Sequence, residues 1–190
     1  MSTAFESTGA ACFLLARGAK PGLRDLRLEA PLHKAVCCGN ITLACALVRA
    51  GGSLNVVSVS GLTALDLASR EGAAQRDRLL EAITTPPLWV PDDVSSMCML
   101  CRGAFSARRR RHHCRHCGCT VCHSCSPRKL TIDKFGAPLQ PVRCCHLCFA
   151  VLSGTELAMP PAPPTFEQPA PFGATVRLVN TLQHQVCSSP

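Results

Sequence analysis

The chain has 190 residues, a formal net charge of +8 and 15 cysteines, which is enough chain for one ordinary domain or two small ones. Its first residues lack the basic start and long apolar run of a secretory signal, so we expect the cysteines to bind metal in a reducing compartment rather than form disulfides in a secreted protein. No apolar stretch approaches the roughly 20 residues that a transmembrane helix needs, and any membrane contact should therefore be peripheral.

The first part of the chain repeats itself with a period of 33 residues. Residues 30–33 (Ala-Pro-Leu-His) align with residues 63–66 (Thr-Ala-Leu-Asp), and Gly39 aligns with Gly72. A period of this length is typical of stacked helical repeats. With proline at a helix start and glycine where helices should stop, the pattern predicts helices near residues 6–16, 31–38, 41–50, 64–71 and 75–84.

This repeat resembles the ankyrin signature, carried by Pro31–Ala35 and by residues 47–51, over about residues 5–84. The resemblance implies either a helical spacer or a surface on the turn tips that binds an unidentified protein. The tip at residues 55–61 offers no obvious anchor side chain. About three repeats are usually needed for a stable stack, so we expect the zinc module or a partner to cap the outer helices. Residues 85–88 form a linker around two prolines.

Eight cysteines between positions 98 and 148 fall into four Cys-x-x-Cys pairs. Two residues between sulfurs let one tight turn aim both thiolates at one tetrahedral ion. Four pairs therefore predict two closed sites holding two structural Zn2+ ions, with no open position for a substrate. The predicted ligands are Cys98, Cys101, Cys114, Cys117, Cys122, Cys125, Cys145 and Cys148.

A basic run surrounds the second pair, where residues 110–117 read Arg-Arg-His-His-Cys-Arg-His-Cys. Residues 89–150 contain ten lysines and arginines but only three aspartates, so most of the net charge lies there. Because the ligand thiolates offset part of this charge, the basic character is concentrated on one strand. Such a strand suits a compact anionic ligand.

Residues 89–152, the zinc module, resemble a FYVE zinc finger. Three signatures of that family appear in order: Trp-x-x-Asp at residues 89–92, the basic run at 110–118, and Arg143-Cys144-Cys145, in which Cys144 stands where the family has valine. The resemblance implies two small antiparallel sheets and a C-terminal helix near Cys145–Leu152. It also implies interleaved sites, in which the first and third pairs bind one zinc and the second and fourth pairs bind the other.

The ligand implied by the resemblance is phosphatidylinositol 3-phosphate. By family analogy, Arg115 and Arg143 hold the 3-phosphate, while Arg110 and Arg111 favour the 1-phosphate side. His112 and His113 would donate hydrogen bonds to phosphate or ring hydroxyls, and Asp92 would accept hydrogen bonds from ring hydroxyls. Arginine suits this role because its planar fork matches phosphate oxygens.

The sequence departs from the family in the loop before the basic strand. The family usually inserts an apolar loop into the membrane, whereas residues 106–109 here read Ser-Ala-Arg-Arg. We expect these arginines to favour an anionic lipid surface, at about 1 kcal/mol per basic residue. Membrane binding by a single copy should then be weak and sensitive to salt.

Other functions fit the sequence less well. A RING pattern, which would make a ubiquitin-ligase adaptor, uses His116 and Cys119 as ligands but leaves Cys125 unused. A nucleic-acid role is unlikely, because the chain has no tyrosine and only Phe105 lies near the basic run for stacking. No nucleophile–base or paired-carboxylate arrangement appears, so we do not expect an enzyme.

The combined prediction is an α+β multidomain chain with four regions. These are ankyrin-like repeats (5–84), a linker (85–88), the zinc module (89–152) and a disordered proline-rich tail (153–190). Its expected role is that of a cytoplasmic adaptor, peripheral on early endosome membranes through phosphatidylinositol 3-phosphate.

Overall fold

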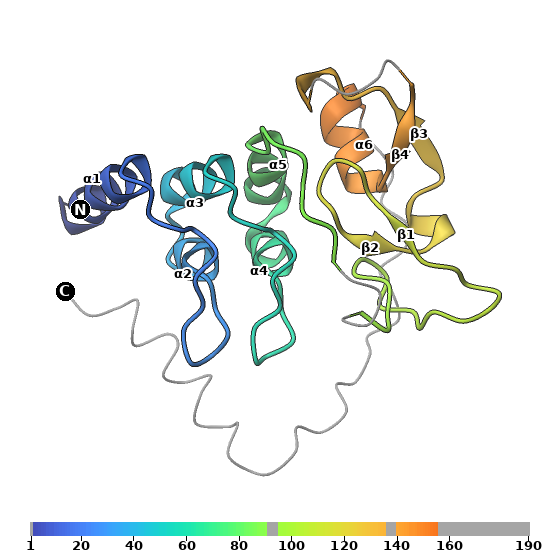
Figure 1. The fold of residues 1–190 in the computed structure, drawn as a ribbon, viewed down its shortest axis with the longest axis horizontal. Helices are drawn as coiled ribbons and strands as arrows, with labels where there is room; N and C mark the ends of the chain where they lie inside the picture. Colours follow the sequence, from blue (N-terminus) through green and yellow to red (C-terminus); the bar gives the residue numbers. More distant parts are fainter. Residues whose placement is uncertain (1, 91–94, 136–139, 156–190) are drawn as a thin grey trace, which may run out of the picture. The chain divides into compact units, whose positions relative to one another are not determined.

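The computed structural model describes residues 2–90, 95–135 and 140–155. The first part consists of α-helices that pair side by side (Figure 1), and the loops between the pairs extend as two fingers, the first finger (residues 17–30) and the second finger (residues 50–63). The helices are α1 (Ser2–Ala16), α2 (Pro31–Cys37), α3 (Ile41–Arg49), α4 (Ala64–Glu71) and α5 (Ala73–Glu81). The predicted helical repeats are confirmed, although α1 begins earlier than expected and α5 is shifted toward the N-terminus.

The first helices of the two repeats, α2 and α4, begin at aligned positions but are capped by different side chains. In α4, the Thr63 hydroxyl accepts from the Asp66 backbone N–H (3.1 Å) and the Asp66 carboxylate accepts from the Thr63 N–H (2.9 Å), a reciprocal cap. In α2, the Nδ1 of His33 accepts from the Ala30 N–H (3.1 Å), and its Nε2 lies 3.0 Å from the carbonyl oxygen of Val56. His33 thus ties the start of α2 to the second finger.

The zinc module contains two small antiparallel sheets and a terminal helix, as predicted. Strand β1 (His112–His113) pairs with β2 (Thr120–Val121), and β3 (Arg128–Leu130) pairs with β4 (Val142–Cys144). Short 3-10 helices cover His123–Cys125 and Asp133–Phe135, and α6 spans His146–Ser153. The paired part of the basic run is shorter than we expected, because only His112 and His113 form strand and Arg115 lies in the turn that follows.

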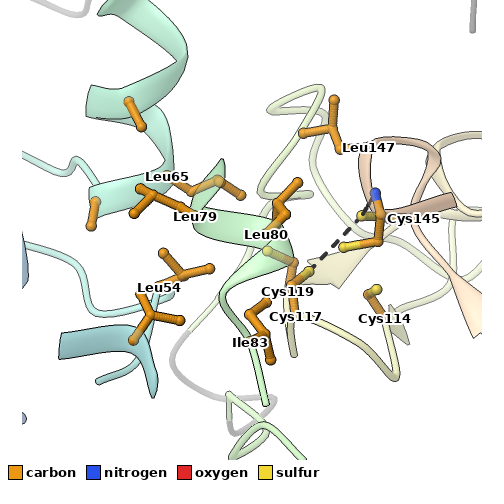
Figure 2. Close-up of a cluster of buried hydrophobic side chains, with 14 of the residues drawn as sticks. Leu54, Leu65, Leu79, Leu80, Ile83, Cys114, Cys117, Cys119, Cys145 and Leu147 are labelled. Carbon is orange, nitrogen blue, oxygen red and sulfur yellow. Dashed lines mark hydrogen bonds between the residues drawn. The ribbon is translucent and has the colours of Figure 1, made fainter. Parts of the chain in front are cut away.

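A continuous set of buried apolar side chains joins the repeats to the zinc module. Leu79 and Leu80 of α5 are fully buried, and Leu147 of α6 is 7% exposed. Figure 2 shows Leu80 between the leucines of the repeats and the cysteines of the module. All the described elements fall within one unit, residues 1–158.

Two further observations concern the whole chain. None of the described helices is both long and apolar enough to cross a membrane. The predicted proline-rich tail lies outside the described residues from position 156 onward.

Candidate functional site

Eight cysteines gather into two groups of four. The first group is Cys98, Cys101, Cys122 and Cys125, and the second is Cys114, Cys117, Cys145 and Cys148, with all ligand atoms of a group within 4.8 Å of one another. These are the interleaved sets that the sequence resemblance implies. We call them site one and site two.

The sulfur distances fit zinc. Four sulfurs about 2.3 Å from a tetrahedral Zn2+ lie roughly 3.8 Å apart. The Sγ atoms of Cys101 and Cys122 are 3.8 Å apart in site one, and those of Cys117 and Cys145 are 3.9 Å apart in site two. A disulfide requires about 2.05 Å, so the two clusters are those of two structural Zn2+ ions.

Interleaving lets the two ions hold four separate segments. Site two joins the turn after β1 to the start of α6, where the Cys145 sulfur caps the helix by accepting from the Cys148 N–H (3.5 Å). Burial raises the pKa of the Cys148 thiol, so without a cation it keeps its proton. Zinc would favour the thiolate and release that proton on binding.

Arg109 is exposed, yet its guanidinium lies against site one. Its Nη2 donates to the Cys101 sulfur (2.8 Å) and to the Cys122 sulfur (3.4 Å). The nearby sulfurs raise the pKa of Arg109. Arg108 and Arg109 are both exposed, so the expectation that these loop arginines favour an anionic lipid surface stays a prediction, and Arg109 in addition contacts site one.

Two buried cysteines lie close to site two without joining its group of four. The Cys119 sulfur donates to the amide oxygen of Asn55 (2.9 Å). Cys144 lies on β4, where the neighbouring Cys114 sulfur and, after it, burial raise the pKa of its thiol. It fills a strand position that valine occupies in the family, as the sequence suggested.

The RING pattern disagrees with this arrangement. It would leave Cys125 unused, but Cys125 belongs to site one. It would make His116 a ligand, but His116 is fully buried and stacks on the Phe135 ring with centroids 5.7 Å apart. Burial lowers the pKa of His116 to about 4, so this ring is neutral.

The two predicted 3-phosphate ligands meet through the backbone. The Arg115 N–H donates to the carbonyl oxygen of Arg143 (2.9 Å). The Arg143 guanidinium donates to the Ser126 carbonyl oxygen (2.5 Å), which fixes its direction. The Arg115 guanidinium lies 3.8 Å from the centre of the Trp89 ring. Its Nη1 is buried with no hydrogen-bond partner among the described residues.

The two histidines of the basic run have different surroundings. His113 stacks on Trp89 with ring centroids 5.4 Å apart, and its Nε2 lies 3.0 Å from the Val90 carbonyl oxygen. His112 faces the His123 ring at 6.0 Å. Partial burial lowers the pKa of His112, and the charge of Arg143 adds to this effect.

The other described residues predicted to bind the lipid do not gather around Arg115 and Arg143. Arg110 is exposed, and Arg111 lies over the Phe105 ring at 5.1 Å while its Nε donates to the Ser95 carbonyl oxygen (3.1 Å). Asp92 lies outside the described residues. Sequence reasoning missed the roles of Trp89 as a stacking platform and of Ser126 as a partner of Arg143. The single tryptophan was a signal for the first, but nothing in the sequence indicated the second.

Comparison with known proteins identifies the two parts of the chain. Residues 88–154 match the FYVE zinc finger family, and residues 9–68 match ankyrin repeats. Human Rabankyrin-5 is 37% identical over 117 residues, which are 60% of this chain and 9% of that protein. Human zinc finger FYVE domain-containing protein 26 is 46% identical over 70 residues, which are 35% of this chain and 3% of that protein. The match thus spans less than a tenth of either relative.

One solved structure extends the comparison. The LM5-1 FYVE domain from Leishmania major is 34% identical, and the match covers 37% of this chain and 83% of that domain with a TM-score of 0.32.

Proposed function

We propose that this chain, a FYVE zinc finger preceded by ankyrin repeats, binds phosphatidylinositol 3-phosphate on endosomal membranes and presents the repeats to a protein. FYVE zinc fingers are a family that binds this lipid, and both modules are typically non-catalytic. The zinc ions would serve as structural clamps, because each has four cysteine ligands and no open position.

The observation that carries the proposal is Nη1 of Arg115, which is buried and has no hydrogen-bond partner among the described residues. A buried donor without a partner is costly, and a charged one more so, unless a ligand completes it. Arg143 lies beside Arg115 along the backbone, and His112 precedes them on β1. A phosphate monoester has the charge and the acceptors that this group of donors needs.

The test is lipid binding by the zinc-loaded full chain. Vesicles of phosphatidylcholine and phosphatidylserine would contain phosphatidylinositol 3-phosphate, another monophosphate isomer or a bisphosphate, and bound protein would be measured by sedimentation. We expect selective binding to the 3-phosphate vesicles. Arg115→Ala should weaken that binding by about tenfold or more, since hydrogen bonds to charged groups contribute about 1.5–3 kcal/mol.

The matched control is Arg108→Ala, which removes the same charge from the preceding loop. We expect a smaller loss that disappears as salt rises, because Arg108 is exposed and would act only through surface charge. Equal binding to every phosphoinositide, or equal losses for the two variants, would reduce the site to a generic basic patch and reject the proposal.

The protein-binding part of the proposal is supported by apolar side chains on the fingers. Leu23 is 66% exposed, Leu26 is 103% exposed and Val59 is 70% exposed. The Val59 N–H donates to the Arg27 carbonyl oxygen (2.9 Å), so the two fingers are held together. Two of these three exposed apolar side chains lie on the first finger, and Val59 lies at the tip of the second finger, so both fingers offer apolar surface to a partner.

A further inference from the structure

Two of the four zinc-binding turns, the first turn (Cys98–Cys101) and the second turn (Cys114–Cys117), are followed directly by a residue in the left-handed conformation. Arg102 follows Cys101 with φ +57°, and Gly118 follows Cys117 with φ +78°. Glycine adopts this conformation without strain, whereas other residues rarely do. The arginine of the first turn makes a side-chain contact that glycine could not make.

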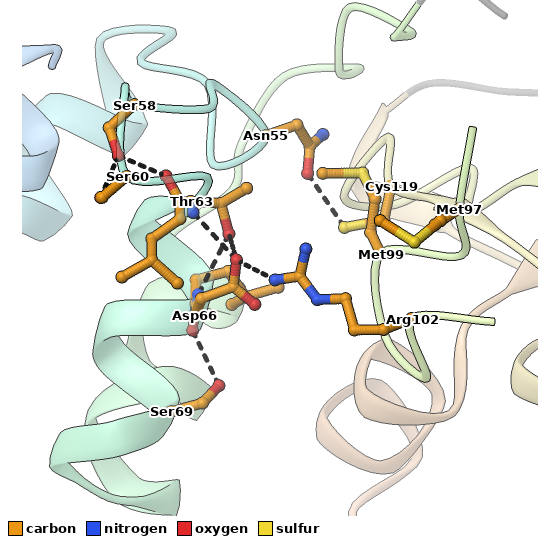
Figure 3. Close-up of polar contacts among 12 residues, drawn as sticks. Asn55, Ser58, Ser60, Thr63, Asp66, Ser69, Met97, Met99, Arg102 and Cys119 are labelled. Atoms are coloured by element: carbon orange, nitrogen blue, oxygen red, sulfur yellow. Dashed lines mark hydrogen bonds and ion pairs between the residues drawn. The ribbon is translucent and has the colours of Figure 1, made fainter. Parts of the chain in front are cut away.

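That contact is an ion pair with the repeats. Nη2 of Arg102 lies 2.6 Å from Oδ2 of Asp66 on α4 (Figure 3). The same carboxylate also accepts from the Thr63 hydroxyl (2.7 Å) and completes the cap of α4. The side chains of Arg102 and Asp66 are 38% and 22% exposed, so the pair is partly shielded from water. The strained residue of the first turn is thus attached to the start of α4.

The second turn approaches the repeats so closely that a side chain would not fit. A Cβ at Gly118 would lie 2.9 Å from the Leu88 carbonyl oxygen and 3.0 Å from Nδ2 of Asn55. Asn55, on the second finger, is 5% exposed. Its Nδ2 donates to the Cys117 carbonyl oxygen (2.6 Å), and its Oδ1 accepts from the Cys119 sulfur (2.9 Å). One amide therefore holds the residues on both sides of Gly118.

The apolar contact between α5 and α6 completes the junction. Leu80 on α5 is fully buried, and Ile83 just after that helix is 7% exposed. Figure 2 places both residues toward the cysteines of site two. A stack of so few repeats is marginal alone because its last helix lacks a neighbour. Here the zinc module occupies the position of that neighbour.

We infer that the last ankyrin repeat (α4, α5 and the second finger) and the zinc module fold as one cooperative unit. The first and second zinc-binding turns, one from each zinc site, dock on the repeat at Arg102 and Gly118. Zinc binding, which is strongly coupled to the folding of its module, therefore also stabilises the helices of the repeat. This inference concerns the stability of the chain and holds whether or not the proposed lipid is its ligand.

The first test is hydrogen exchange in the full chain, followed peptide by peptide with mass spectrometry. Removing zinc with a chelator should speed exchange of the amides in α4 and α5 by about tenfold or more, although neither helix contains a zinc ligand. Re-addition of Zn2+ should restore the slow rates. Unchanged exchange in α4 and α5 while the zinc module becomes unprotected would overturn the inference.

The second test keeps zinc bound and disturbs only the junction. Gly118→Ala should speed exchange in α4 and α5, because the added methyl group meets Asn55 and Leu88. The matched control is Gly154→Ala, which imposes the same left-handed strain (φ +64°) where a Cβ meets nothing within 4 Å. Equal effects of the two substitutions on α4 and α5, at equal zinc content, would overturn the inference.

A milder pair remains informative if Gly118→Ala fails to fold. Arg102→Gly relieves backbone strain in the zinc module but removes the ion pair, so it should speed exchange in α4 by about threefold or more. Leu28→Gly relieves the same strain at φ +57° in the first finger and should leave α4 unchanged. Exchange in α4 that is unaffected by Arg102→Gly would show that the two parts are not coupled there.

Discussion

The repeats and the zinc module have cores made of different residue types. The repeats bury leucine, valine and alanine from paired helices, such as Leu32, Val36 and Ala44. The zinc module buries mainly cysteine sulfurs and has strands of only two or three residues. In the first case stability comes from apolar area removed from water, and in the second from two metal ions. The two parts of the chain therefore draw their stability from different sources.

The comparison also explains how two parts that would each have low stability alone can form one folded chain. A module of about 60 residues buries too little surface to be stable without staples, and a short repeat stack lacks a cap. Each part supplies what the other lacks, because zinc fixes a surface on which α5 packs. The predictions below separate the metal contribution from the apolar contribution.

The largest effect is expected from loss of site two. Cys117→Ser should lower the zinc content from two ions to one per chain and unfold the zinc module, since a structural zinc contributes about 10–16 kcal/mol against a typical total stability of about 5–15 kcal/mol. Elemental analysis and near-ultraviolet circular dichroism measure these changes. Cys12→Ser, at an exposed cysteine, should change neither. Retention of two ions by Cys117→Ser would contradict the assignment of site two.

The next largest effect is expected from a substitution in the apolar core of the repeats. Leu80→Ala should lower the free energy of unfolding by about 2–5 kcal/mol, as expected for a large-to-small change at a fully buried site. Denaturant unfolding followed by circular dichroism at 222 nm gives this value. Leu26→Ala, on the fully exposed side of the first finger, should stay within about 0.5 kcal/mol. Similar losses for both leucines would mean that α5 is not buried as described.

Arg109 tests whether site one depends on a neighbour outside its four ligands. Because its guanidinium donates to two ligand sulfurs, Arg109→Ala should lower zinc affinity at site one by about 10–100-fold, the usual effect of losing such a partner. Competition with a chromophoric chelator measures the affinity. Arg108→Ala removes an equal charge from the same loop without touching a sulfur and should have little effect. Indistinguishable affinities of the two variants would show that the contact of Arg109 with the sulfurs does not stabilise zinc at site one.

The smallest effect is expected at the side-chain cap of α4, which differs from that of α2. Thr63→Ala removes the hydroxyl that caps α4 and should cost about 1 kcal/mol, measured by denaturant unfolding. Thr42→Ala is the control, because Thr42 is exposed in the first turn of α3 and its helix is capped by Asn40 instead. A loss at Thr42 as large as the loss at Thr63 would argue against the cap.

Local patterns determined the parts of this protein that depend on short spacing. The 33-residue period predicted the helix pairs, and the Cys-x-x-Cys spacing predicted two zinc sites, because each of these features forms between residues near in sequence. The pairing of the four cysteine pairs came only from family resemblance. Spacing alone allows several pairings, and the choice depends on how β1, β2 and α6 pack.

Tertiary structure alone decided where the charged and polar side chains point. Arg109 and Arg108 are neighbours in one basic run, yet only Arg109 binds sulfur, because the loop turns back on site one between Ser106 and Arg109. Asn55 looked like an ordinary residue of a finger tip, and Arg102 like an ordinary surface charge. Their partners lie 62 residues away for Asn55 and Cys117 and in the other module for Arg102 and Asp66, and no local pattern encodes contacts over such separations.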